Sequence, residues 1–151
     1  MAGASRCLTI IDVFTREGVA IEVGQSLCGE DVVRTFNKLK HGGRTPKLLF
    51  CDNGSEFSGQ AMDLWAYQND VKIDFSRPGK PTDNAFIESF NGTFRDECLN
   101  VHRFETLAEA RQLIEAWRQE YNESRPHRAL DDRTPSEFAS QYAASRVLTA
   151  T

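Results

Sequence analysis

Strand-like and helix-like segments alternate along this 151-residue chain, and that alternation is the strongest constraint on its fold. Residues 7–14 and 18–25 are rich in β-branched residues and flank a charged turn, which predicts a hairpin. The later patterns predict, in order, a helix over 29–40, a strand over 47–52, a helix capped by Ser58, a strand over 71–75, a helix containing Glu88, and helices beginning at Thr106 and Thr134. This order indicates an α/β fold: a mixed sheet with an antiparallel hairpin at one side, flanked by helices.

The composition favours one domain without a disulfide framework or a zinc site. A chain of this length with 40% hydrophobic residues can bury one substantial core, so we expect a single domain over residues 1–151. The four cysteines have no close pairing, and the three histidines complete no zinc-ligand spacing, which predicts reduced thiols. We expect a cytoplasmic protein that binds no membrane, because no apolar stretch is long enough to span one and no signal peptide is recognisable. The net charge of -4 argues against a surface that binds phosphate everywhere, but it does not exclude local contact with DNA.

Two carboxylates stand in positions typical of a metal site. Asp52 directly follows the apolar run Leu48–Cys51, so a buried strand would deliver it to the edge of the sheet. Glu88 lies in a strong helical pattern, with 35 residues between it and Asp52. Mg²⁺ is held by one or two carboxylates that leave coordination positions for water and substrate phosphates. Taken alone, Asp52 also fits a tight Asp-Asn-Gly turn, and Glu88 a solvated helix position.

The helix that contains Glu88 has two distinct stripes. Apolar residues recur at helical spacing along one of them, and polar residues recur along the other at steps of three and four. The apolar stripe consists of Ile87, Phe90, Phe94 and Cys98, and the polar stripe of Asn84, Glu88, Asn91 and Arg95. One face is therefore predicted to pack on the core while the other meets a ligand.

Several blocks of the sequence resemble the integrase catalytic core of insertion-sequence transposases, in particular the IS3 family. The longest runs from Arg77 to Asn100 and includes the helix of Glu88. Retroviral integrases share the fold and the 35-residue spacing, but the late Tyr-Asn-x-x-Arg-Pro-His block favours the bacterial elements. The shorter matching blocks are residues 9–17, 50–57, 121–127 and 134–138.

The resemblance implies a ribonuclease H-like fold and DNA strand cleavage and joining by an Asp-Asp-Glu triad. Asp52 matches the second acid and Glu88 the third, so both are implied to be catalytic and metal-binding. The complete family site holds two Mg²⁺ (or Mn²⁺) ions, which stabilise the entering and leaving oxygens of an in-line attack on a phosphodiester.

The implied partners are DNA, at the element ends and the target, and either further copies of the chain or a full-length transposase. Candidate DNA contacts are Lys80, Asn84, Asn91 and Arg95, all in or near the helix of Glu88. Capping and surface roles fit the two asparagines and Arg95 equally well, and a solvated loop position fits Lys80. The closing block, Tyr121, Asn122, Arg125 and His127, is predicted to lock the last helices in place rather than to do chemistry. Trp65 and Trp117 are predicted to belong to the core.

The chain departs from the family pattern at the first acid. In the family that acid lies on a first, central strand upstream of the hairpin, whereas Met1 here already adjoins the hairpin. Asp12 is the only early aspartate, and we expect it to support a turn rather than to replace the missing ligand. A sheet without its central strand would leave unpaired backbone groups on both flanking strands.

Three functional hypotheses follow from these observations. The first is a fragment of a transposase that catalyses metal-dependent DNA cleavage and joining, inactive alone because the first catalytic Asp is absent. The alternative is a catalytically dead remnant that binds DNA or full-length transposase. A third hypothesis, a hydrolase that uses Asp52 and Glu88 as acid and base without metal, has no sugar-site residues to support it.

Overall fold

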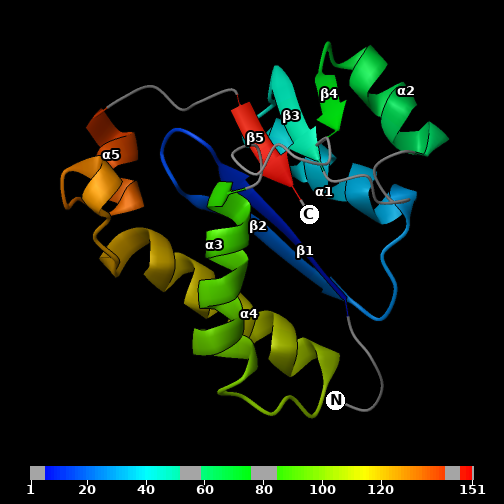
Figure 1. Cartoon of the computed structure of the whole chain (residues 1–151). Coiled ribbons are helices and arrows are strands. Elements are labelled where there is room, and N and C mark those ends of the chain that lie inside the picture. Colours follow the sequence, from blue (N-terminus) through cyan, green and yellow to red (C-terminus); the bar gives the residue numbers. More distant parts are fainter. Residues whose placement is uncertain (1–5, 52–58, 76–84, 142–146, 151) are drawn as a thin grey trace.

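A five-stranded mixed sheet lies between two layers of helices (Figure 1). The computed structural model describes residues 6–51, 59–75, 85–141 and 147–150. In chain order, the elements are β1 (Arg6–Asp12), β2 (Gly18–Gly24), α1 (Gly29–His41), β3 (Leu48–Cys51), α2 (Gln60–Gln68), β4 (Lys72–Phe75), α3 (Ala85–Phe94), the π-helix η2 (Arg95–Leu99), α4 (Leu107–Ser124), the 3-10 helix η3 (Arg128–Leu130), α5 (Pro135–Gln141) and β5 (Val147–Ala150). The predicted ribonuclease H-like α/β class is confirmed, and so is each predicted helix and strand. The predicted cap Ser58 lies outside the described residues, and Gly59, in extended conformation, directly precedes α2.

The centre of the sheet is filled by a strand that the sequence analysis did not foresee. The strand order is β2-β1-β5-β3-β4. β5 pairs antiparallel with β1 and parallel with β3, so it occupies the position that was expected to be empty. Its four residues complete hydrogen bonding on edges of β1 and β3 that would otherwise stay unpaired inside the protein. Such a short apolar segment carries no periodic signal from which a strand could be predicted.

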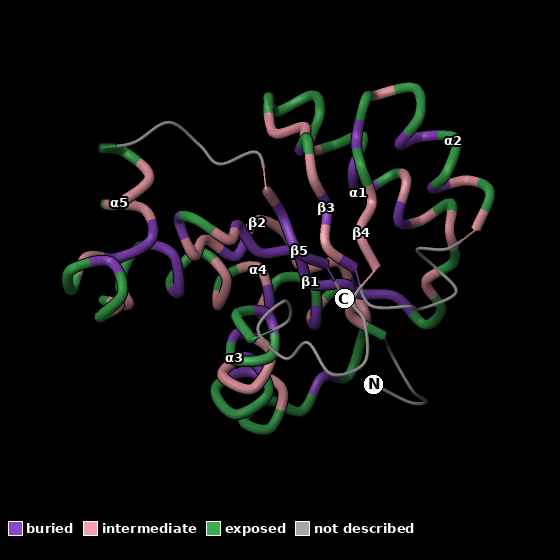
Figure 2. The backbone as a smooth tube through the Cα atoms, turned by 45° about the horizontal axis from the view of Figure 1, so that its top comes forward, coloured by how far each residue is buried: buried purple, intermediate pink, exposed green. Residues whose placement is uncertain are grey.

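Each face of the sheet has its own apolar core (Figure 2). Under α1 and α2, Leu8 and Ile10 of β1 pack with Phe36, Trp65 and Leu148. On the opposite face, strand residues from β1 and β2 pack under α3, η2 and α4. This second core includes Ile11, Val23, Ile87, Phe90, Phe94, Cys98, Ile114 and Tyr121. The alternation of residues 8, 10 and 11 between the two cores shows that β1 is buried on both faces.

Two predicted capping boxes start the late helices. Thr134 Oγ1 accepts a hydrogen bond from the Glu137 amide, and the Glu137 carboxylate accepts one from the Thr134 amide, at 3.1 and 3.0 Å. Thr106 Oγ1 likewise accepts from the Glu109 amide at 3.0 Å. The Glu109 carboxylate, however, accepts from the amide of Glu105, one residue before the predicted cap. Both helices thus begin where the Thr-x-x-Glu pattern predicts.

The closing block ties α4 to the hairpin. Asn122, which is buried, accepts a hydrogen bond from the Gly18 amide at 2.7 Å and donates one to the Gly18 carbonyl at 3.0 Å. Gly18 starts β2, and a Cβ atom there would lie 2.8 Å from the Phe90 ring. Tyr121 packs on the rings of Phe90 and Trp117, and Trp117 is only half-buried. The predicted locking role therefore extends beyond the last helices to the first hairpin.

Replacing Asn122 with Ala should lower the free energy of unfolding by about 2 kcal/mol, because the Gly18 amide would lose its buried acceptor. Urea denaturation followed by circular dichroism measures the change. Asn100, which is exposed, provides the matched control, and its replacement by Ala should change stability by less than about 0.5 kcal/mol. Equal effects of the two substitutions would contradict the bridging role of Asn122.

The stability of the fold should also depend on pH through His127. Burial, together with the charges of Arg125 and Arg16, lowers the pKa of His127 below its ordinary value of 6.5. The unfolded chain then binds a proton that the folded chain resists, so stability should fall as the pH drops below 6.5. The pKa values of Glu115 and Glu137 are lowered from 4.5, so the stability that these carboxylates contribute is lost only at pH values below about 4.5. The urea midpoint of the parent protein should be lower at pH 5.5 than at pH 7.5, and this difference should shrink in the His127→Gln variant. If the difference stayed the same in the variant, the pH dependence would come from another titrating group.

Candidate catalytic face of the sheet

The carboxyl ends of three parallel strands meet at one edge of the sheet. β3 pairs with β4 on one side and with β5 on the other, both in parallel. Leu49 and Cys51 are fully buried, which anchors β3 up to its last residue. Asp52 follows Cys51 directly in the sequence. Asp52 itself, with Lys80 and Asn84, lies outside the described residues.

The predicted two-sided character of α3 is present in the structure. Ile87, Phe90 and Phe94 are buried, and the apolar stripe continues to Cys98 in η2. On the polar stripe, Glu88 and Arg95 are exposed, and Asn91 is half-buried. The core contacts of the apolar stripe therefore determine which way Glu88 faces, since side chains three and four positions apart share one side of a helix.

Two contacts show where α3 crosses the sheet. Thr9 Oγ1 donates a hydrogen bond to Asn91 Oδ1 at 2.8 Å, and Ile87 packs with Ile11 in one apolar cluster. The segment of α3 that contains Glu88 therefore passes over β1 between Thr9 and Ile11. The pairing register makes Ile10 level with Ala150 of β5, and Ala150 level with Cys51 of β3. Glu88 is thus carried at the same level of the sheet as the carboxyl end of β3.

Asn91 and Arg95 border a small hollow beside β1. The hollow has a volume of about 160 Å³ and is lined by Cys7, Thr9, Asn91, Phe94, Arg95 and Leu99. Burial raises the pKa of the Cys7 thiol above its ordinary value, so the thiol is protonated at neutral pH. Asn91 uses its side-chain oxygen to hold α3 against β1, and Arg95 is the more accessible of the two for contact with a ligand.

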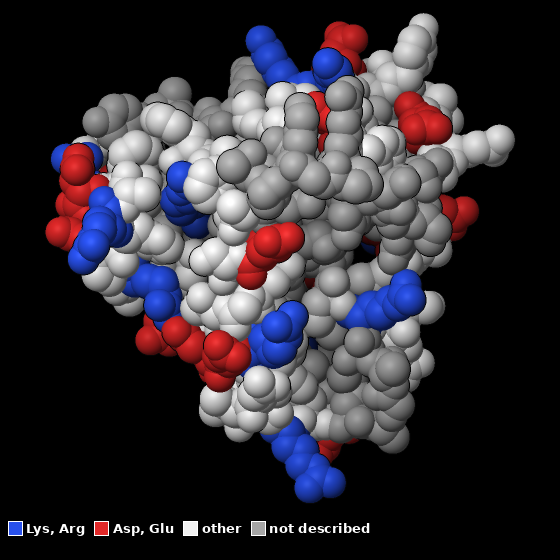
Figure 3. All heavy atoms as spheres, viewed as in Figure 1, with Lys and Arg blue, Asp and Glu red and all other residues white. Residues whose placement is uncertain are grey.

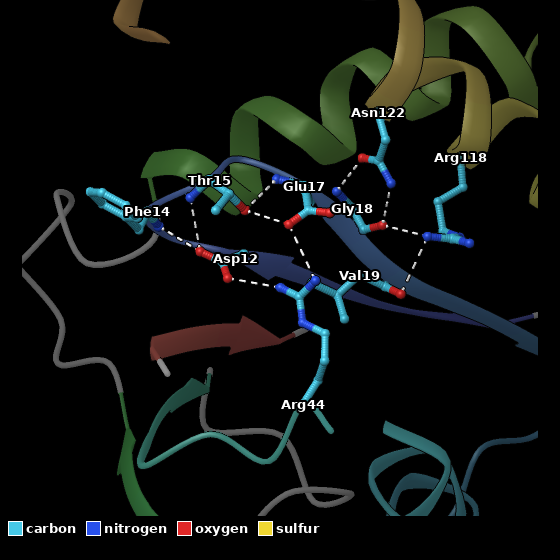
Figure 4. Close-up of polar contacts among 9 residues, drawn as sticks. All are labelled: Asp12, Phe14, Thr15, Glu17, Gly18, Val19, Arg44, Arg118 and Asn122. Carbon is cyan, nitrogen blue, oxygen red and sulfur yellow. Dashed lines mark hydrogen bonds and ion pairs between the residues drawn. The ribbon is translucent and has the colours of Figure 1, made fainter. Parts of the chain in front are cut away.

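Asp12 is engaged as a structural residue at the opposite end of β1 (Figure 4). Its Oδ1 accepts hydrogen bonds from the amides of Phe14 and Thr15, at 2.8 and 2.9 Å. Its Oδ2 forms an ion pair of 2.9 Å with Arg44, which also pairs with Glu17. The strand register aligns Asp12 with Leu148 and Leu49, away from the end of β3 that precedes Asp52. The predicted turn-supporting role is confirmed, whereas no local pattern had pointed to Arg44 as its partner.

Comparisons with known proteins agree with this arrangement. Two models described as integrase core domain match the chain, one over residues 1–81 and the other over residues 69–135. The first of these alone spans more than half of the chain.

The chain belongs to the integrase core domain family.

Curated relatives of this integrase core come from bacterial insertion elements. The uncharacterized 31.7 kDa protein of insertion element IS407 from Burkholderia multivorans is 51% identical over 93% of this chain and 50% of its own length. The uncharacterized 39.2 kDa protein of IS476 from Xanthomonas euvesicatoria is 44% identical over 91% of the chain and 40% of its own length. The transposase for insertion sequence element IS904 from Lactococcus lactis is 33% identical over 85% of this chain and 52% of its own length. The chain spans about half the length of these relatives.

Charges of both signs are interleaved on the visible face of the integrase core (Figure 3). Among the described residues drawn there, Lys and Arg side chains lie among Asp and Glu side chains rather than forming one continuous basic patch. The described charges on this face thus agree with the net charge of -4, which argues against a surface that binds phosphate everywhere. Within the described ranges, no helix has the length and apolar character to span a membrane.

A complete metal site cannot be assembled from the described residues alone, because they contain no group of three His, Cys, Asp or Glu side chains placed to hold an ion. Glu88 nevertheless offers oxygen ligands on an accessible helix face, and oxygen is what Mg²⁺ prefers. The donor type fits a hard divalent cation provided that Asp52 contributes the second carboxylate.

Proposed function

We propose that this integrase core serves DNA strand cleavage and joining in the transposition of an insertion element. The observation that carries the proposal is the placement of Glu88, exposed on α3 at the level of the carboxyl end of β3, where the sequence continues with Asp52. The family match and the insertion-element relatives support DNA as the substrate. Further copies of the chain or a full-length transposase are the proposed protein partners.

Asp52 and Glu88 would hold the divalent cation, Mg²⁺ or Mn²⁺, with two ions expected in the complete family site. When bound, such ions stabilise the charge on the entering and leaving oxygens of a phosphodiester. Asn91 keeps α3 on β1 and so sets the position of Glu88. We assign Arg95, Lys80, Asn84 and the side-chain amide of Asn91 to phosphate and sugar contacts, which position DNA without reading its sequence.

The chain on its own should bind metal weakly and join DNA poorly. The strand at the centre of the sheet is β5, and its residues Val147–Ala150 include no carboxylate. Asp12 is engaged with Arg44 at the carboxyl end of β1, level with Leu49 rather than with Cys51 of β3. Our proposal therefore assigns the site two carboxylates, Asp52 and Glu88, and affinity for a divalent cation falls with the number and charge of its ligands.

Removing either carboxylate should weaken Mn²⁺ binding by about tenfold or more, because each substitution takes away a charged oxygen ligand. Titration calorimetry of Asp52→Asn and Glu88→Gln measures this without requiring catalysis, and joining of labelled oligonucleotides tests the activity. Glu120, exposed on α4, supplies the control, and Glu120→Gln should bind Mn²⁺ like the parent. Unchanged affinity in both site variants would remove the proposed metal role.

A second candidate function, binding without catalysis, is favoured by the same lack of a carboxylate in β5. In that case the chain would associate with DNA or with a full-length transposase and reduce its activity. Pull-down with an intact relative tests the protein partner, and fluorescence anisotropy at several salt concentrations tests DNA. Absence of both associations would eliminate this candidate.

A further inference from the structure

A hollow beside α4 is separate from the candidate catalytic face. It has a volume of about 450 Å³ and lies between α4 and the π-helix η2, which follows α3 directly. Figure 1 shows α4 beside the end of α3, and Phe94 of α3 packs on Trp117 of α4. We call this space the α4 hollow. Its aromatic and charged lining residues are Glu97, Trp117, Glu120, Tyr121 and Arg125.

The two aromatic side chains of the α4 hollow provide a surface for stacking. Trp117 and Tyr121 are one turn apart on α4, and their ring centroids are 5.3 Å apart with 39° between the planes. Phe90 packs against both rings, with centroid distances of 5.5 Å to Trp117 and 4.9 Å to Tyr121. Because the core fixes these rings, a planar ligand can stack on them at little cost in conformational entropy.

Tyr121 also brings a hydroxyl group to the α4 hollow. The residue is only 7% exposed, yet its hydroxyl makes no hydrogen bond with the described residues. Burial raises the pKa of Tyr121 to about 12, so the hydroxyl keeps its proton at neutral pH. A tyrosine buried to this extent usually has a hydrogen-bond partner. The hydroxyl therefore provides the hollow with a neutral group that can accept or donate a hydrogen bond.

Carboxylates outnumber cations along the α4 hollow. Glu97 is occupied, because it pairs with Arg125 and accepts a hydrogen bond from Trp117 Nε1 at 3.3 Å. Glu120 is exposed and forms neither a hydrogen bond nor an ion pair with the described residues. Glu123, also exposed, follows one turn later on α4. Among the described residues, Arg125 is the one cation that lines the hollow, and Glu97 neutralises it, so the net charge there is negative.

These properties define the chemical class of the ligand. A stacking surface favours a planar group, and a carboxylate beside it favours a cation that donates hydrogen bonds. The guanidinium group of arginine is both planar and cationic, whereas the ammonium group of lysine is a compact point charge. The phosphates of DNA carry the opposite charge, and Glu120 and Glu123 would repel them. A hollow of about 450 Å³ is large enough for one long side chain with part of its backbone.

We propose that the α4 hollow is a docking site for an arginine side chain in a basic segment of a partner protein. The guanidinium group would stack on Trp117 and Tyr121 and donate hydrogen bonds to the Glu120 carboxylate and the Tyr121 hydroxyl. Basic residues beside this arginine would lie near Glu123. The proposal adds a protein-binding surface to the integrase core and does not depend on metal or DNA chemistry at Glu88.

Titration of the full chain with short peptides tests the proposal. The probe is the acetylated and amidated peptide Gly-Ser-Lys-Arg-Lys-Ser-Gly, and the tryptophan indole signals in proton–nitrogen NMR spectra report where it binds. The Trp117 signal should shift. The Trp65 signal provides an internal control and should stay in place, because Trp65 is 4% exposed and donates its indole N–H to Asn37.

Changes in the peptide separate charge from shape. Citrulline in place of the arginine keeps a planar group of similar size but removes the charge, so binding should weaken by about tenfold or more. Lysine in the same place keeps the charge but loses the planar stacking, and it should weaken binding by about threefold. Equal binding of the arginine and citrulline peptides would overturn the proposal.

Changes in the protein identify the hollow. Glu120→Gln should weaken binding of the arginine peptide by about tenfold, and Tyr121→Phe by about threefold. Glu30→Gln makes the same charge change at an exposed position of α1, in the other helical layer, and should bind like the parent. Urea midpoints check that the variants stay folded, since Glu120 is exposed and the Tyr121 hydroxyl has no described partner.

The remaining outcomes distinguish this surface from the DNA function. A single-stranded oligothymidine should leave the Trp117 signal in place, and Glu88→Gln should bind the arginine peptide like the parent. If the oligonucleotide shifted the Trp117 signal and the peptide did not, the α4 hollow would be a nucleic-acid site and the proposal would be wrong. Peptide binding that Glu120→Gln left unchanged would also overturn it.

Discussion

Replacement of Leu148 with Ala is expected to lower the free energy of unfolding by about 2–5 kcal/mol. Leu148 is 1% exposed at the middle of β5, where it packs in the core under α1 and α2. The substitution leaves a cavity at the point where the two halves of the sheet are joined, so the cost should fall in the upper part of this range. Urea denaturation followed by tryptophan fluorescence measures it.

The matched control is another leucine in a different environment. Leu64 on α2 is 58% exposed, and Leu64→Ala should change stability by less than about 0.5 kcal/mol. If Leu148→Ala were as mild as this control, β5 would not be the strand that completes the core.

Replacement of Asp12 with Ala is expected to cost about 3–5 kcal/mol, the range for removing one partner of a buried ion pair. The Asp12 side chain is fully buried, and the Arg44 side chain is only 23% exposed. The substitution would leave Arg44 without this carboxylate and would deprive the Phe14 and Thr15 amides of their acceptor. Thermal and urea unfolding should both report the loss.

The conservative variant separates the two contributions. Asp12→Asn keeps an oxygen that can accept from the Phe14 and Thr15 amides but removes the charge that pairs with Arg44. It should therefore be less destabilising than Asp12→Ala, and it should leave Mn²⁺ affinity unchanged because Asp12 lies away from the end of β3. A large drop in metal affinity would instead make Asp12 a ligand and contradict its assignment to the turn.

Much of the local structure could be predicted from particular residues. The Thr134-x-x-Glu137 pattern predicts a helix start and forms the reciprocal pair of hydrogen bonds expected of it. The spacing of Ile87, Phe90 and Phe94 predicts which side of α3 is buried, and with it the exposure of Glu88. These features depend on neighbours three or four positions away, which the sequence displays directly.

The candidate site could be predicted only in part. The roles of Asp52, Lys80 and Asn84 stay predictions, because these residues lie outside the described ranges. Glu88 and Arg95 have the exposure that a ligand-facing stripe requires, but the contact of Asn91 with Thr9 joins residues 82 positions apart. No periodic pattern links two such residues, so the position of α3 over β1 emerged only from the folded chain.

By itself, the sequence determined the predicted helices and strands up to α5, the caps at Thr106 and Thr134 and the two-sided character of α3, because hydrophobic periodicity and capping act over a few residues. The tertiary structure alone decided that Val147–Ala150 would become the central strand, that Arg44 would neutralise Asp12, and that Asn122 would bind Gly18 from 104 positions away. The physical reason is that buried backbone groups and charges must be paired, and their partners are the complementary groups that the folded chain brings next to them. That choice depends on the completed packing and not on local sequence.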